Sequence, residues 1–327
     1  MTGPVLAAAL LLAPPAGASA FLEALHRADA RAADDPERVE FATRAIRAWK
    51  PSDGDELLAD AYFRRGEGDF AAWDDAAANV DLGLALAHDA RNRAALLLRG
   101  RARLRAGRAA DAERDFLDYT AARADDGEGW LGLAEARLAR GLPRADKPAL
   151  AALAAAARLL DADDPRPKIA AGRAHAAAGR LLEALNSLDA AAACGKDHLA
   201  EALAWRARVK ADLRNPRGAR DDGGRAAEDL EARLDGMLRL RAPAAGLEAA
   251  RAEAADARFR RAAVEEALSL PADALEDYED ACDLGRADAC ARAAALAPKD
   301  AAPSARPKRR RWKSNPSDDA GTRIYAN

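Results

Sequence analysis

Residues 92–116 read NRAALLLRGRARLRAGRAADAERDF, and the pattern of small residues in this stretch recurs along the chain. The pattern is a bulky residue, a small residue four positions later, a turn glycine and a second small residue. It is filled by Leu96, Gly100, Gly107 and Ala112, then 34 residues later by Trp130, Ala134 and Gly141, then by Gly172, Gly179 and Ala184, and finally by Ala207 and Ala219. A nearly fixed period of this length predicts stacked pairs of helices.

The composition supports an all-helical chain. Of the 327 residues 94 are alanine, half are hydrophobic and only 5% are aromatic. Alanine loses no side-chain entropy in a helix, whereas the β-branched residues that sheets favour are scarce. No run of 18 apolar residues occurs beyond the extreme N-terminus, which argues against a transmembrane span.

The pattern resembles the tetratricopeptide repeat (TPR), in which a small residue on helix A lets two helices touch. Gly100 and Ala134 occupy that position, and Gly107, Gly141 and Gly179 match the turn that follows helix A. The resemblance implies an all-α, TPR-like superhelical solenoid of stacked antiparallel helix pairs. We expect about seven pairs.

Composition and pattern divide the chain into six segments. They are a signal peptide (1–20), degenerate N-terminal helical repeats (21–91), TPR-like repeats (92–228), an irregular helical segment with an Ala-Pro-Ala turn (229–254), a terminal repeat and cap (255–297) and a disordered basic tail (298–327). Within the second segment, Gly68-Asp69-Phe70 resembles a repeat turn.

The first twenty residues have the layout of a secretory signal peptide. Val5–Ala13 is apolar, two prolines follow, and Ala18-Ser19-Ala20 is an A-x-A cleavage sequence. Cleavage after Ala20 would give a periplasmic or secreted protein. The alternative is a first helix in an alanine-rich chain, which would leave a cytosolic TPR adaptor.

Residues 274–290 resemble a Sel1-like repeat of the cysteine-rich secreted type. In that family two cysteines eight residues apart join successive helices, so the resemblance implies a disulfide between Cys282 and Cys290. The alternative is two buried thiols that act as small apolar side chains. Cys194 has no cysteine eight residues later and is expected to be a buried thiol.

The sequence contains no recognisable catalytic, metal or cofactor motif. Its four histidines are isolated, and no phosphate-binding loop or S-x-x-K motif occurs. The aspartate pairs 125–126, 163–164 and 221–222 lie near expected helix ends, where they would cap helices. We therefore expect no enzyme and no cofactor. Some relatives of the cysteine-rich type bind or weakly hydrolyse penicillins, which leaves a secreted cell-wall or β-lactam ligand-binding protein as an alternative.

The TPR resemblance also implies a concave groove lined by residues one position past the small residue of helix A. These residues are Arg101, Glu135, Arg173 and Arg208, with Arg105 one turn beyond Arg101. Because arginine pairs with carboxylates in a bidentate manner, we expect an acidic peptide or a chain terminus as the partner. The alternative is that arginines and aspartates form exposed ion pairs of little energetic value.

The C-terminal tail is the second candidate binding element. Residues 298–327 carry eight basic groups against three aspartates, a net +5, which leaves −8 for the rest of a chain whose formal charge is −3. Its centre is Lys308, Arg309, Arg310, Arg311, Trp312 and Lys313. In an exported protein this segment suits an anionic envelope polymer or lipid rather than nucleic acid. The alternatives are a solvated tail that lies against the acidic body and, in a nuclear or cytosolic protein, a localisation or nucleic-acid-binding element.

These expectations converge on a non-catalytic scaffold that binds a protein or peptide partner.

Overall fold

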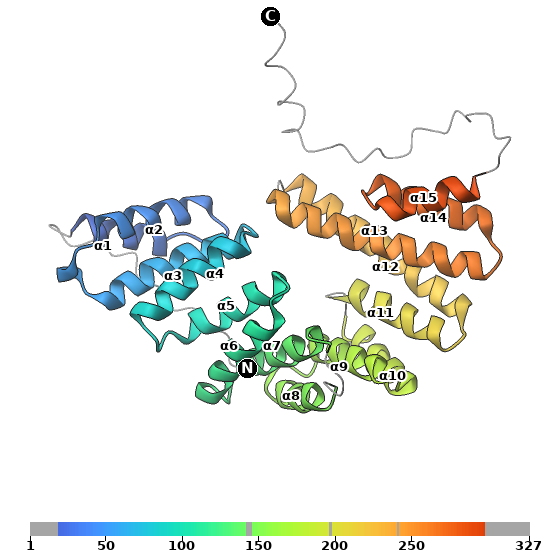
Figure 1. The fold of residues 1–327 in the computed structure, drawn as a ribbon, viewed down its shortest axis with the longest axis horizontal. Helices are drawn as coiled ribbons and strands as arrows, with labels where there is room; N and C mark the ends of the chain where they lie inside the picture. The colour runs from blue at the N-terminus through green and yellow to red at the C-terminus, as the bar shows by residue number, and fades with distance from the viewer. Residues whose placement is uncertain (1–18, 142–145, 196–197, 241, 298–327) are drawn as a thin grey trace, which may run out of the picture. The chain divides into compact units, whose positions relative to one another are not determined.

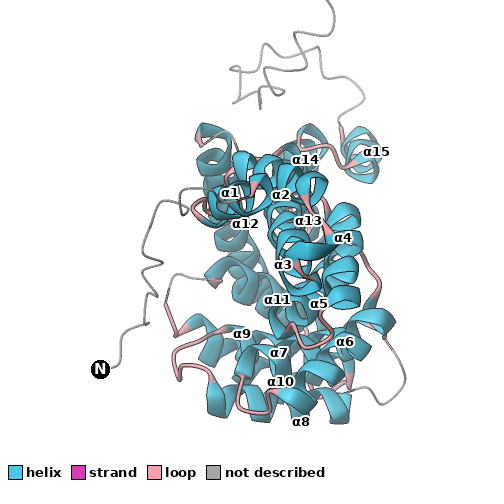
Figure 2. Cartoon of the chain, turned by 90° about the vertical axis from the view of Figure 1, so that its left-hand side faces the viewer, coloured by secondary structure: helices cyan, strands magenta, loops and turns pink. Residues whose placement is uncertain are grey.

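A computed structural model describes residues 19–141, 146–195, 198–240 and 242–297. These residues contain fifteen α-helices, one short 3₁₀ helix and no strand (Figure 2). Fifteen helices are enough for seven successive pairs and one further helix. The chain divides after Ala178 into two compact units, each of which is a separate stack of helices.

Unit 1 is built from nine α-helices within the described residues (Figure 1). They are α1 (Ala20–Asp29), α2 (Pro36–Ala48), α3 (Asp55–Ala71), α4 (Asp75–His88), α5 (Arg93–Arg105), α6 (Ala109–Ala122), α7 (Gly127–Ala139), α8 (Asp146–Leu159) and α9 (Arg166–Ala177), with the 3₁₀ helix η1 (Pro51–Asp53) before α3. Each helix contacts the next, and each odd-numbered helix also contacts the following odd-numbered one. Successive pairs therefore stack in register.

Unit 2 contains six α-helices in its described part. They are α10 (Leu181–Ala192), α11 (Leu199–Asp212), α12 (Pro216–Arg239), α13 (Ala244–Ala267), α14 (Pro271–Asp283) and α15 (Ala287–Leu296). Consecutive helices of this unit also pack against one another. The boundaries expected after residues 228 and 254 both fall inside helices, because α12 and α13 each run for 24 residues around the Ala-Pro-Ala turn.

The turn glycines adopt the backbone conformation that the sequence pattern requires. Gly107, Gly141 and Gly179 have φ values of +74°, +59° and +73°, where a side chain would be strained. The turn expected at Gly68 is wrong. Gly68 lies inside α3 beside Val39, and the chain turns instead at Trp73, whose φ is +64°.

The small residues allow helices to approach one large ring. The Phe116 side chain is fully buried on α6 and lies against both Gly100 of α5 and Gly132 of α7. A β-carbon at Gly100 would come within 2.9 Å of the ring, and one at Gly132 within 2.4 Å. Ala112 and Ala134 belong to the same apolar cluster, so the repeated small residues lie at helix crossings as expected.

In the part of the chain that the structure describes, four helix pairs contain a buried arginine–aspartate ion pair that was not predicted from the sequence. In each, an arginine on the first helix bonds an aspartate sixteen residues later on the second. The pairs are Arg65–Asp81, Arg99–Asp115, Arg206–Asp222 and Arg261–Asp277. All four aspartate side chains are at most 6% exposed. Such pairs differ energetically from the exposed ion pairs considered above, since losing one partner leaves a buried charge.

Asp222 corrects one expectation directly. It does not cap a helix but lies inside α12, where it accepts hydrogen bonds from Arg206 at 2.7 Å and contacts Lys210 at 2.7 Å. Asp126, by contrast, does cap α7, because its side chain accepts from the Glu128 amide. The adjacent Gly223 and Gly224 pack against Arg261 of α13.

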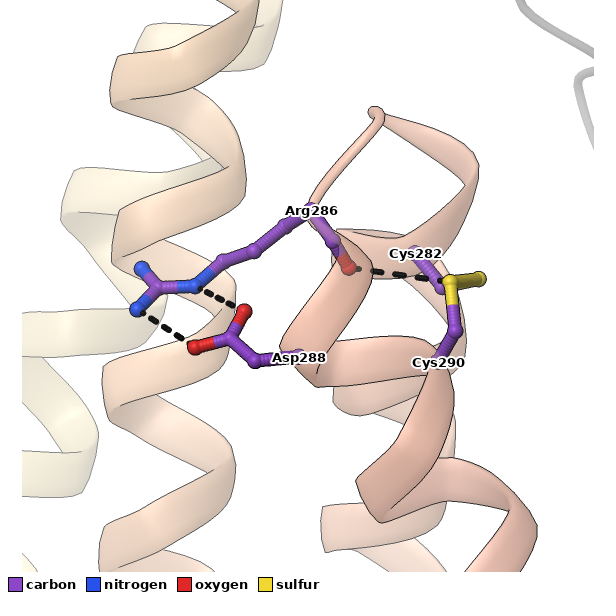
Figure 3. Close-up of a disulfide and its surroundings, with 4 residues drawn as sticks. All are labelled: Cys282, Arg286, Asp288 and Cys290. Carbon is purple, nitrogen blue, oxygen red and sulfur yellow. Dashed lines mark hydrogen bonds and ion pairs between the residues drawn. A yellow bond between two sulfur atoms is a disulfide. The ribbon is translucent and has the colours of Figure 1, made fainter.

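A disulfide joins α14 to α15. Cys282 and Cys290 have α-carbons 4.8 Å apart, and Gly285 turns the chain between them with φ of +104°. Figure 3 shows the bond beside Arg286, whose guanidinium donates to Asp288 at 2.8 Å. The half-buried Cys194 thiol donates to the Ala190 carbonyl oxygen at 3.1 Å.

Two expected segments lie mainly outside the described residues. The proposed signal peptide is described only from residue 19, where Ser19 caps α1, and the basic tail 298–327 is not described. Among the helices that are described, none combines the length and apolarity needed to cross a membrane.

Candidate functional site

A cleft in unit 2 lies between α11, α12 and α13. Its volume is about 860 Å³. It is lined by His198, Leu199, Ala200, Glu201, Ala204, Trp205 and Arg208 of α11 and its cap, Asp229, Leu230 and Arg233 of α12, and Glu253, Asp256, Ala257 and Arg260 of α13. A space of this size can hold several side chains of a partner.

Helical periodicity explains why these residues face one another. On α11, Glu201, Trp205 and Arg208 are spaced by four and three residues, so they share one face of the helix. On α13, Glu253 and Ala257 follow the same spacing. One face of α11 and one face of α13, each the first helix of its pair, therefore line the cleft.

The cleft has an apolar floor and a charged rim. Leu230 and Ala257 are buried, and Trp205 is half-buried beside them. The Arg208 guanidinium lies 5.1 Å from the centre of the Trp205 ring, a cation–π arrangement. The rim carries carboxylates and guanidinium groups in nearly equal number. This arrangement suits an amphipathic protein segment better than a wholly acidic one.

A smaller hollow of about 280 Å³ in unit 1 brings together three of the expected groove residues. Arg101, Arg105 and Glu135 line it with Phe70, Leu104, Glu128, Leu131, Gly132 and Arg166. The first helices α5 and α7 supply most of this lining. Residues predicted from two different repeats therefore line one hollow.

The arginines of this hollow are paired by the chain itself. Arg101 contacts Glu128 at 2.5 Å, and Arg166 contacts the other oxygen of Glu128 at 2.6 Å. Arg105 donates to Asp75 at 2.7 Å and stacks on Phe70 with its guanidinium carbon 3.9 Å from the ring centre. Little positive charge is left here for an acidic peptide.

The two remaining groove residues lie apart from this hollow. Arg208 lines the cleft of unit 2, whereas Arg173 is half-buried on α9 and lines neither space. The structure thus does not gather the five residues into one site within either unit. Their role in binding stays a prediction.

The sequence reading missed Trp205, Glu201 and Asp229. Trp205 and Glu201 could have been found, because they precede Arg208 by three and seven residues on one helix face. Asp229 could not, since it lies on α12 beyond the last recognised repeat position. No group of three or more metal-ligating side chains occurs in the part of the chain that the structure describes.

Comparison with known proteins identifies the fold. No family model matches the chain. No curated protein matches it either. Among solved structures, a tetratricopeptide repeat protein from Parabacteroides merdae is similar over 85% of this chain and 98% of its own, with 12% identity and a TM-score of 0.60.

Two further TPR structures are similar over part of the chain. A thermophilic TPR protein from Thermus thermophilus matches 58% of this chain and 99% of its own length, with 23% identity and a TM-score of 0.48. The C-terminal part of a TPR protein from Cytophaga hutchinsonii matches 83% of this chain and 98% of its own, with 13% identity and a TM-score of 0.49.

The fold is thus a TPR-like solenoid of helix pairs, which confirms the predicted fold class. The Sel1-like character of the terminal unit stays a prediction. The same holds for export.

Proposed function

We propose that this chain is a non-catalytic scaffold that holds a protein partner in the cleft between α11, α12 and α13. The observation that carries the proposal is the cleft itself, with a half-buried tryptophan and an apolar floor inside a charged rim. Apolar centres with polar rims are the usual anatomy of protein-binding surfaces, and tryptophan and arginine are the residues most enriched there. The TPR fold supports the proposal at the level of architecture.

Site-specific photocrosslinking tests the location of the partner. A benzoylphenylalanine at Ala204, inside the cleft, is compared with one at Leu182, which is 65% exposed on α10. In extract of the native cell we expect one partner to be captured from position 204 and not from position 182. Capture of the same proteins from both positions, or of none from position 204, contradicts the assignment.

We also propose that the protein works outside the cytoplasm, in the periplasm or beyond. The support is the layout of residues 1–20 and the Cys282–Cys290 disulfide, since such bonds persist in oxidising compartments. Sequencing the N-terminus of the protein from its native cell decides the matter. A chain that begins at Phe21 agrees with export, and one that retains Met1 contradicts cleavage after Ala20.

A further inference from the structure

In the cleft of unit 2, one helix carries an acidic and a basic side chain that form no ion pair with an arginine, lysine, aspartate or glutamate of the described residues. On α11, Glu201 and Arg208 lie seven residues apart, about 10 Å along the helix axis, with Trp205 between them. Arg208 stacks on Trp205 and makes no ion pair with the described residues. The nearest charged partner of Glu201 is His198 at 3.5 Å, which attracts it only when protonated. One end of this face thus offers an anion and the other a cation.

Other charged side chains of the rim already form ion pairs within the protein. Arg260 contacts Asp256 at 2.5 Å on α13, and Arg286 donates to the same carboxylate. Arg233 reaches Glu253 at 3.4 Å. These pairs need no ligand to neutralise them. Glu201 and Arg208 are therefore the charged groups that can select a partner.

Two further carboxylates, those of Glu253 and Asp229, line the cleft. Burial raises the pKa of Glu253, against the lowering effect of Arg233, and the charge of Glu201 raises it further. Glu201 of α11 and Glu253 of α13 both line the cleft, and Arg233 already pairs with Glu253. Asp229 of α12 lines the cleft and has no ion-pair partner among the described residues. A partner's ammonium or guanidinium group could pair with Glu201 and Asp229.

The middle of the cleft is apolar. Ala204 and Trp205 of α11 face Leu230 of α12 and Ala257 of α13. The small side chains of Ala204 and Ala257 leave room in the cleft that an aromatic or large aliphatic side chain could fill. Burial of such a side chain contributes about 1.5–3 kcal/mol.

We propose that the cleft binds a protein segment in which one aromatic or large aliphatic residue is flanked by a basic residue on one side and an acidic residue on the other. The basic group pairs with Glu201 and Asp229, the apolar side chain enters the apolar middle of the cleft, and the acidic group pairs with Arg208. This inference rests on the proposed function and narrows it to a partner of opposite flanking charges. It differs from the acidic peptide expected from the sequence, because it also requires a basic and an apolar residue in the partner.

A displayed library of random twelve-residue peptides, selected on the full chain, tests the inference. We expect enrichment of peptides with an apolar residue between a base and an acid in one fixed order. Synthetic peptides from that selection should weaken at least about tenfold when their two flanking charges are exchanged. Enrichment of peptides with only acidic or only basic flanks overturns the inference and leaves the proposed function intact. Failure to enrich any peptide that competes with the crosslinked partner contradicts both.

A charge exchange on the protein supplies the second measurement. The double variant Glu201→Lys/Arg208→Glu should bind the exchanged peptides and reject the original ones. The matched control Arg225→Glu/Glu228→Lys exchanges two exposed charges of α12 that do not line the cleft, and it should retain the original preference. Both variants should have the helix content of the parent chain by circular dichroism. An unchanged preference in the first variant overturns the inference.

Discussion

Removal of the Asp115 carboxylate should destabilise the α5–α6 pair more than any exposed charge can. Asp115 is 2% exposed and accepts hydrogen bonds from Arg99 at 2.7 and 3.1 Å and from Arg103 at 2.7 Å. In Asp115→Ala, Arg99 and Arg103 would both lose this partner, although their side chains are only 19% and 17% exposed. Breaking a buried pair by removing one partner costs about 3–5 kcal/mol, and partial access to water places this case near the lower figure.

Urea unfolding followed by circular dichroism measures the loss. Because repeat proteins can unfold in parts, hydrogen exchange of the α5 and α6 amides should accompany it and show the largest change. The matched control is Asp125→Ala, which removes a 77% exposed partner of Arg123 and should leave the urea midpoint unchanged. Equal midpoints for the two variants would refute the reasoning that burial makes this pair important.

Three further changes test the packing, a half-buried acid and the disulfide. Gly132→Ala should lower the free energy of unfolding by about 1–3 kcal/mol in urea, because its β-carbon would lie 2.4 Å from the Phe116 ring; a neutral result would mean that the helices can separate freely. Burial and the charge of a neighbouring aspartate raise the pKa of Asp69 to about 7, so its protonated form is favoured in the folded state. The stabilisation of the folded state by protonated Asp69 is therefore complete below about pH 4 and is lost as the pH rises through 7. Thermal melts of Asp69→Asn should show a weaker pH dependence of the melting temperature in this window. Reduction of Cys282–Cys290 should destabilise α14 and α15 by about 2–3 kcal/mol, seen as faster hydrogen exchange confined to these helices; unchanged exchange would contradict a role in stability.

The helix pairs could be predicted because their determinants are local. A glycine that ends a helix with positive φ, as Gly107 and Gly141 do, needs no knowledge of the rest of the chain. The small residues recur with the repeat because each pair crosses its neighbour at the same place. The turn at Trp73 escaped prediction because a non-glycine residue takes the left-handed conformation there, and only the surrounding packing can hold it.

Only the tertiary structure decided how charged residues are used. The sequence shows arginine and aspartate sixteen residues apart, but it cannot say that Asp115 and Asp222 are buried while Asp125 is exposed. It likewise predicted Arg101 and Arg208 as equivalent groove residues, yet Glu128 neutralises the first and the second stacks on Trp205. The repeat pattern determined which residues lie at helix crossings. Which charges remain open to a partner depends on side chains from other helices, and those neighbours are set by the fold.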